Sequence, residues 1–245
     1  MQISLPSSRL RAILNGSTLF VSLALLGISP AMMILSMRGM HRMDSAWPEA
    51  YYEWFLGPPT HSGHKHLVQL VYNNTNEHMI LAAGIAGVFA GIVSVVGFFL
   101  AQKTLKLNAQ NHTIRLQIIP GIVSFIVSLI AFIYTQIIFD TENSGKCRFA
   151  DGYTPNNVFD CTREQAAGSI VVFLTNDPTR LAEIYETQRS VHGDTQTSRA
   201  LLVPLFVASI LMCGFTVGKL LIEKKEYRYV ETPDERVERL QRQEE

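Results

Sequence analysis

MILAAGIAGVFAGIVSVVGFFLA, residues 79–101, is an apolar run of 23 residues that contains no Asp, Glu, Lys or Arg. A helix rises about 1.5 Å per residue, so a run of this length spans the roughly 30 Å hydrocarbon core of a bilayer. Three further runs have the same character: residues 14–37, 116–139 and 200–222. Among all four runs, Lys219 is the only charged residue. The sequence therefore predicts an all-α integral membrane protein with a bundle of four transmembrane helices.

The four spans divide the rest of the chain into five segments. These are an N-terminal segment, a first loop, a short connection, a second loop and a C-terminal tail: residues 1–13, 38–78, 102–115, 140–199 and 223–245. Basic residues accumulate beside the spans on the cytoplasmic side of a membrane. Nine lie at one set of span ends, eight of them in the two terminal segments and the short connection and the ninth, Lys219, within a turn of the end of the fourth run; three, Arg38, Arg42 and Arg199, lie beside the spans at the two loops. We therefore expect both termini in the cytoplasm and both loops outside the cell or in the secretory lumen. The membrane is then the plasma membrane or one of the secretory pathway.

The second loop contains two of the three cysteines, Cys147 and Cys161. The residues between them are rich in Gly, Pro and Asn and have almost no apolar periodicity that could fold them. The secretory lumen is oxidising, and a disulfide that closes a loop of about 15 residues stabilises a protein by roughly 3 kcal/mol. We predict a structural disulfide, with free or metal-bound thiols as the alternative. The sequence has no Cys-x-x-Cys pattern, which argues against redox catalysis.

Two helix-start signals follow Cys161. Thr162-Arg163-Glu164-Gln165 has the pattern of a capping box and precedes the mostly apolar residues 166–174. Asn176-Asp177-Pro178 then begins a second predicted helix, over residues 179–190. The second loop is therefore predicted to be a helical cap on the bundle, pinned by the disulfide.

In the first loop, aromatic residues recur at spacings of three and four. They follow a helix-start signal at Asp44 and are Trp47, Tyr51, Trp54 and Phe55. This spacing predicts one face of a short helix that lies at the level of the lipid headgroups, where aromatic rings partition well. A binding surface for a partner is the alternative.

Three histidines lie within six residues of the first loop: His61, His64 and His66. Imidazole nitrogens suit zinc or copper, and such tracts can bind metal. Lys65 adds a positive charge in the middle of the run, and no Cys or carboxylate lies at ligand spacing. We expect a solvated loop and no cofactor, with a metal site as the alternative.

Asn73-Asn74-Thr75 is an N-glycosylation acceptor pattern on the expected outer side. It lies about five residues from the second span, which is close for the lumenal enzyme to reach. We expect Asn73 to be modified poorly or not at all. The pattern at Asn111 lies in the short connection and should stay unmodified.

The second span carries small residues in a row, Ala83, Gly87 and Gly91. Lipid supplies no hydrophobic force between helices, so close approach at small residues is what holds a helix pair together. We expect this row to pack against another helix of the same bundle, and self-association through the second span is the alternative.

Tyr227 and Val230, in the C-terminal tail, match the tyrosine-x-x-hydrophobic pattern that sorting adaptors bind. A four-residue pattern is common by chance, and this one lies next to the membrane. It is a candidate sorting motif of low specificity.

Four spans, cytoplasmic termini, a short basic connection and a longer second loop with a cysteine pair together resemble the MARVEL-type tetraspans, the occludin-like membrane organisers. The resemblance covers nearly the whole chain and is one of topology. It implies a four-helix bundle and a role in membrane organisation, and no binding residue is carried over from it. The first-loop pattern of claudins and the Cys-Cys-Gly motif of tetraspanins are missing from the sequence.

The polar residues of the spans are mainly hydroxyls, and no carboxylate, His or Arg lies centrally in any span. Such groups mark proton and ion pathways in membrane proteins, so transport has little support. We expect a non-enzymatic tetraspan that organises or scaffolds membrane, with the bilayer and other proteins as partners and no nucleic acid. Protein contacts or self-association would use the second span and the second loop. A channel, a transporter or a transporter subunit is the alternative, and a metal-dependent membrane enzyme using the three histidines is a third.

Overall fold

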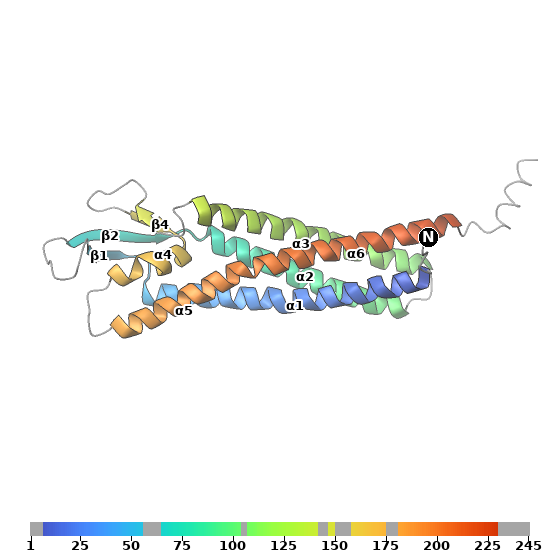
Figure 1. Cartoon of the computed structure of the whole chain (residues 1–245), viewed down its shortest axis with the longest axis horizontal. Coiled ribbons are helices and arrows are strands. Elements are labelled where there is room, and N and C mark those ends of the chain that lie inside the picture. Colours follow the sequence, from blue (N-terminus) through green and yellow to red (C-terminus); the bar gives the residue numbers. More distant parts are fainter. Residues whose placement is uncertain are drawn as a thin grey trace, which may run out of the picture.

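The computed structural model describes residues 7–55, 65–103, 107–141, 147–149, 158–174 and 181–229. Four long helical rods lie side by side and carry a smaller folded unit at one end (Figure 1). The rods are built from α1 (Ser7–Ala46), α2 (Thr75–Lys103), α3 (Leu107–Thr141) and the pair α5 (Leu181–Ala200) and α6 (Leu202–Tyr229). Four of the helices are long and apolar enough to cross a membrane. The predicted all-α four-span bundle is therefore confirmed.

The bundle is apolar outside and contains small polar groups inside. Large side chains such as Phe20, Ile85 and Phe89 are more than half exposed, as expected of a surface that faces lipid. Inside, the Ser22 hydroxyl donates to the Ser94 hydroxyl at 2.7 Å, and other buried hydroxyls donate to carbonyls of their own helix. The Ser22–Ser94 bond thus joins α1 to α2 through uncharged groups.

The small-residue row of α2 packs against α1. A Cβ atom added to Gly87 would overlap the Ser29 hydroxyl, and one added to Gly91 would lie 2.8 Å from Leu26 Cγ. Ala83 is fully buried in the same core. The two helix backbones therefore approach as closely as glycine allows, within one bundle.

Two of the helices continue beyond the bundle. α1 extends past the expected end of its span at Met37 as far as Ala46, and α5 runs almost without interruption into α6. At the step between α5 and α6 the Leu201 amide still donates to the Thr197 carbonyl at 3.0 Å. The helix predicted over 179–190 thus extends to Ala200 and is the extension of the last span.

A small sheet lies beyond the bundle, and the sequence did not predict it. Its strands are β1 (Tyr51–Phe55), β2 (Lys65–Tyr72), β3 (Arg148–Phe149) and β4 (Val158–Cys161), in the order β1-β2-β4-β3. β2 pairs antiparallel with β1 and parallel with β4. Its residues alternate, so that Val68, Leu70 and Tyr72 are buried on one face.

We call this unit the head: the sheet, α4 (Arg163–Ser169), the 3-10 turn η1 (Val171–Leu174), α5 and the part of α1 after Arg38. The head has its own hydrophobic core, separate from the core of the bundle. The core contains residues from every one of these parts, including Met43, Trp47, Leu70, Phe159, Val171 and Val191. The second loop is thus a folded unit built together with the first.

Candidate functional site: the junction between head and bundle

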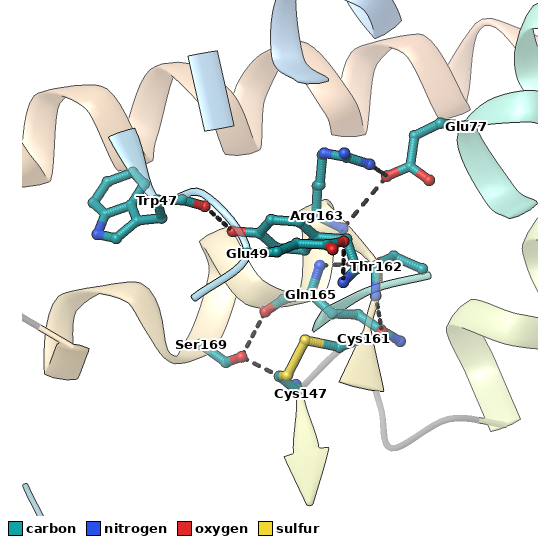
Figure 2. The surroundings of a disulfide bond; sticks show 10 residues. Trp47, Glu49, Glu77, Cys147, Cys161, Thr162, Arg163, Gln165 and Ser169 are labelled. Carbon is teal, nitrogen blue, oxygen red and sulfur yellow. Dashed lines mark hydrogen bonds and ion pairs between the residues drawn. A yellow bond between two sulfur atoms is a disulfide. The ribbon is translucent and has the colours of Figure 1, made fainter. Parts of the chain in front are cut away.

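The predicted disulfide is present. Cys147 and Cys161 are joined with an S–S distance of 2.00 Å and are buried in the head core (Figure 2). The amide of Cys147 donates to the Ser169 hydroxyl at 3.0 Å, which ties β3 to the end of α4. The disulfide therefore fixes β4 and the start of α4 against the rest of the head.

The predicted capping box follows the disulfide directly. The Gln165 amide donates to the Thr162 hydroxyl at 3.3 Å, and the Thr162 amide donates to the Gln165 side chain at 3.0 Å. These two bonds satisfy amides that a helix start leaves without partners. The residues between them, Arg163 and Glu164, are thereby held at the first turn of α4, where both are buried.

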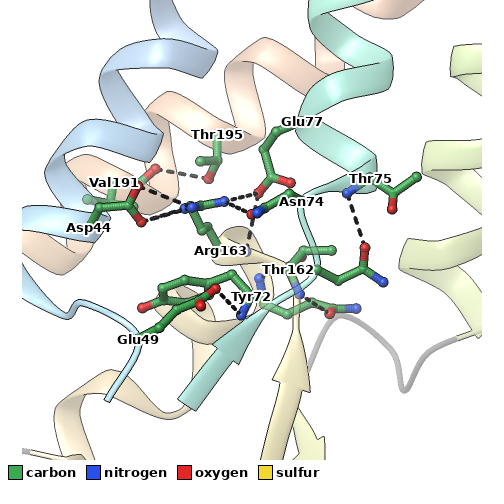
Figure 3. Close-up of polar contacts among 12 residues, drawn as sticks. Asp44, Glu49, Tyr72, Asn74, Thr75, Glu77, Thr162, Arg163, Val191 and Thr195 are labelled. Atoms are coloured by element: carbon green, nitrogen blue, oxygen red, sulfur yellow. Dashed lines mark hydrogen bonds and ion pairs between the residues drawn. The ribbon is translucent and has the colours of Figure 1, made fainter.

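Arg163 connects the head to α1 and to α2. Its guanidinium donates to both carboxylate oxygens of Asp44 on α1, at 2.9 and 3.2 Å (Figure 3). It also donates to the Asn74 side chain just before α2, and it lies 4.8 Å from the centre of the Tyr72 ring. Asp44 therefore accepts from both Nε and Nη2 of Arg163, in the bidentate geometry typical of strong arginine–carboxylate pairs.

Glu77, in the first turn of α2, lies on another side of the same guanidinium. Its Oε1 atom is 3.8 Å from the guanidinium of Arg163 and accepts the Arg163 backbone amide at 3.4 Å. Its Oε2 atom is buried and has no hydrogen-bond partner among the described residues. Glu77 is thus a buried acid that Arg163 satisfies only in part.

Glu164 forms the second connection. Arg199 Nε and Nη2 each lie 3.0 Å from a different oxygen of its carboxylate, a bidentate pair between α4 and the end of α5. The same guanidinium lies 3.6 Å from the centre of the Phe139 ring on α3. Burial raises the pKa of Glu164, and Arg199 opposes that effect. Glu164 is buried, Arg199 is partly exposed, and the two are well matched in geometry.

Two adjacent residues of α4 therefore contact, directly or through one further residue, all four rods of the bundle. Arg163 binds Asp44 and Glu77 on α1 and α2, and Glu164 binds Arg199, which in turn covers Phe139 on α3. We call these six residues, together with Asn74, the junction. No pattern in the sequence pairs these charged residues with one another. The one available signal was the capping box, which fixes where Arg163 and Glu164 begin a helix but not what they contact.

The predicted interfacial helix of the first loop is wrong. α1 continues to Ala46, and Tyr51, Trp54 and Phe55 lie on strand β1. Trp47 is 2% exposed in the head core, and Tyr51 is exposed on the sheet. The side chains of Trp54 and Phe55 lie outside the described residues. In a helix the four aromatic residues would share one face, whereas along a strand successive side chains point to opposite faces. Residues 51–55 form a strand because they pair with β2.

The remaining sequence candidates do not join the junction. His61 and His64 lie outside the described residues, and His66 lies on β2, paired with Trp54. No group of three His, Cys, Asp or Glu side chains that could hold a metal occurs within the described part of the chain. Tyr227 lies in α6, and Val230 is outside the described residues.

Asn73 has a structural contact that bears on its predicted glycosylation. Its side-chain oxygen accepts the Thr75 amide at 3.1 Å, and its own amide donates to the Cys161 carbonyl at 3.0 Å. The side chain that would carry a glycan thus caps the start of α2.

No protein-family model, curated protein or solved structure matches this chain.

Proposed function

We propose that the chain is a non-enzymatic four-span protein that organises or scaffolds membrane at the cell surface or in the secretory pathway. Its head lies on the outer or lumenal side and is the surface through which it binds other proteins. Both termini lie in the cytoplasm. The topological resemblance to MARVEL-type tetraspans favours the same role.

The observation that carries this proposal is the construction of the head. It has a hydrophobic core of its own and a buried disulfide, and it is joined to the spans by two continuous helices and by the junction. The charged side chains of the junction contact other protein groups, as a structural support requires. A folded unit held rigidly on a bundle suits the presentation of a binding surface better than chemistry at the membrane.

The side of the membrane is argued from two independent features. A disulfide persists in the oxidising secretory lumen or outside the cell and is rare in the cytosol. The excess of basic residues, nine against three beside the spans, belongs to the two terminal segments, the short connection and the end of the last span, and the described helix ends that adjoin them lie opposite the head (Figure 1). Both features favour an outer or lumenal head.

Site-specific photocrosslinking in native membranes tests the proposal. A photoreactive residue at Tyr51 or Tyr185 should yield protein adducts, because these head side chains are 61% and 53% exposed. The matched control is Phe89, which is 58% exposed on the bundle and should label lipid instead. Protein adducts from Phe89 with none from the head would overturn the proposal and favour association through the spans.

A channel or transporter is the second candidate, and the buried hydroxyls of the bundle are the observation that favours it. Ser22, Ser94, Ser124 and Ser209 bond to one another in pairs inside the bundle. Against it, these hydroxyls are satisfied by each other and by nearby carbonyls, and α1 lies in close contact with Gly87 and Gly91 of α2. Ion or solute flux in proteoliposomes that contain the purified chain would establish this alternative.

A further inference from the structure

On one side of the junction a single arginine, Arg163, lies between two carboxylates, those of Asp44 and Glu77. Asp44 takes both donors on one side of the Arg163 guanidinium, and Asn74 takes a third. Glu77 is left with a guanidinium contact of 3.8 Å, which is longer than a hydrogen bond. If both acids were ionised, the group of three would carry one uncompensated negative charge.

The two acids differ in how far their side chains are buried, and this difference determines which of them takes up a proton. The Asp44 side chain is 49% exposed, whereas the Glu77 side chain is 5% exposed. Water can therefore solvate a charge on Asp44 but not one on Glu77. Removing a carboxylate from water without full compensation favours its neutral form.

We propose that Glu77 is a proton-binding site, neutral in the assembled junction at neutral pH, while the Asp44 carboxylate keeps its bidentate contact with Arg163. The proton resides on Oε2, the oxygen that has no partner among the described residues. Oε1 keeps its contacts with Arg163. With this proton the charges of Asp44, Arg163 and Glu77 sum to zero.

The chemistry of the site selects a proton over a metal cation. The guanidinium of Arg163, 3.8 Å from Oε1, opposes any bound cation, a proton included, so the number of ligands makes the distinction. A calcium or sodium ion would need several oxygen ligands, whereas a proton needs only one. The free oxygen of Glu77 meets that smaller requirement.

Three helices contribute the titratable groups around Glu77; Arg163, His78 and the backbone amides of Glu77 and Arg163 favour its ionised form, and burial opposes them. α4 contributes Arg163, α1 contributes Asp44, and α2 contributes the neighbouring His78. Val191 and Thr195 of α5, drawn at the same level in Figure 3, are uncharged. Arg163 is thus the one full positive charge in contact with Glu77 among the described residues, and Asp44 has already balanced it.

Assembly of the head on the bundle is then coupled to proton uptake. When α4 separates from α2, Glu77 meets water and loses its proton at neutral pH, as an ordinary carboxyl does. The closed junction binds more protons than the open one, so acidification stabilises the closed form. This coupling depends on the junction alone and not on the side of the membrane that the head occupies.

Hydrogen exchange of the α4 amides in nanodiscs tests the coupling, after correction for the intrinsic exchange rate at each pH. For the wild-type chain, the opening constant should fall by up to about tenfold per pH unit as the pH is lowered from about 8 to about 6. Glu77→Gln keeps the shape of the side chain and cannot ionise. Its opening constant should therefore be independent of pH, and at about pH 8 it should be smaller than that of the wild type. The same pH dependence in Glu77→Gln and in the wild type would overturn the proposal.

Infrared spectroscopy gives a second test that does not require Glu77→Gln to fold. The wild-type chain should show the carbonyl band of a buried protonated carboxyl at about pH 7, far above the ordinary Glu value of about 4.3. Asp44→Asn removes the competitor for Arg163, so this band should disappear at the same pH. A wild-type spectrum without the band, or an Asp44→Asn spectrum that keeps it, would contradict the assignment to Glu77.

Discussion

Arg163 and Glu164 are neighbours in the sequence, yet each holds a different part of the bundle. Arg163 binds Asp44 of α1 at 2.9 Å, and Glu164 binds Arg199 at the end of α5 at 3.0 Å. Both side chains are buried at the first turn of α4, directly after the disulfide. The first turn of α4 thus connects the disulfide-bonded head to the helices of the bundle.

Breaking the Glu164–Arg199 pair should destabilise the head strongly. Glu164→Gln removes the buried carboxylate that pairs with Arg199, whose side chain is 16% exposed, and breaking such a pair costs up to about 3–5 kcal/mol. The free energy of head opening, measured by hydrogen exchange in α4 and α5, should fall by about that amount. Glu186→Gln on the exposed face of α5 is the matched control and should change little. Equal effects of the two substitutions would mean that the pair has no structural role.

Removing the disulfide should loosen the head and leave the bundle intact. The bond joins residues 14 apart, and a loop of this size stabilises by about 3 kcal/mol. Cys147→Ser with Cys161→Ser should therefore increase exchange in β4 and α4, while amides of α2 in the bundle stay protected. Cys213→Ser is the control, because Cys213 is a free thiol in α6. Loss of protection along the spans would show that the head and bundle do not fold as separate units.

Larger side chains at Gly87 should separate α1 from α2. Gly87→Leu forces a side chain into Ser29 and Leu205, so the thermal midpoint of the detergent-purified chain should fall by several degrees. Gly27→Leu is the matched control, because a Cβ at Gly27 meets nothing within 4 Å. If Gly87→Leu changed only the oligomeric state and not the stability, self-association through α2 would be the better interpretation.

Trp47 should behave as a core residue of the head and not as an interfacial aromatic. Trp47→Ala should cost about 3–5 kcal/mol of head stability, whereas Tyr51→Ala, at a 61% exposed position, should cost little. In a Trp54→Phe background, lipids brominated near their headgroups should quench Trp47 fluorescence weakly. Strong quenching would instead support the headgroup position that the aromatic spacing predicted.

Some of these features could be predicted from the sequence because they depend on local signals. Residues 79–101 predict a span by length and composition, and the pattern from Thr162 to Gln165 predicts the start of α4. The disulfide follows from the composition of the loop that it closes and from the expected compartment. Each of these depends on a single stretch of chain.

The rest could not be predicted, since it depends on pairing between distant residues. β2 pairs in parallel with β4, joining Tyr72 to Cys161, and no local pattern specifies that register. The aromatic spacing near Trp47 fits a helix, whereas residues 51–55 form a strand through their pairing with β2. The partners of Arg163 come from two other helices, so its role becomes apparent only once the head has formed.

The position of the head relative to the membrane is tested most directly by glycosylation mapping of the full chain in cells. An acceptor site engineered within residues 151–157 should be modified, and the natural pattern at Asn111 should stay bare. Enzymatic removal of the glycan should restore the mobility of the unmodified chain on a gel. Modification at Asn111 with a bare engineered site would reverse the orientation and contradict a head that binds partners outside the cytoplasm.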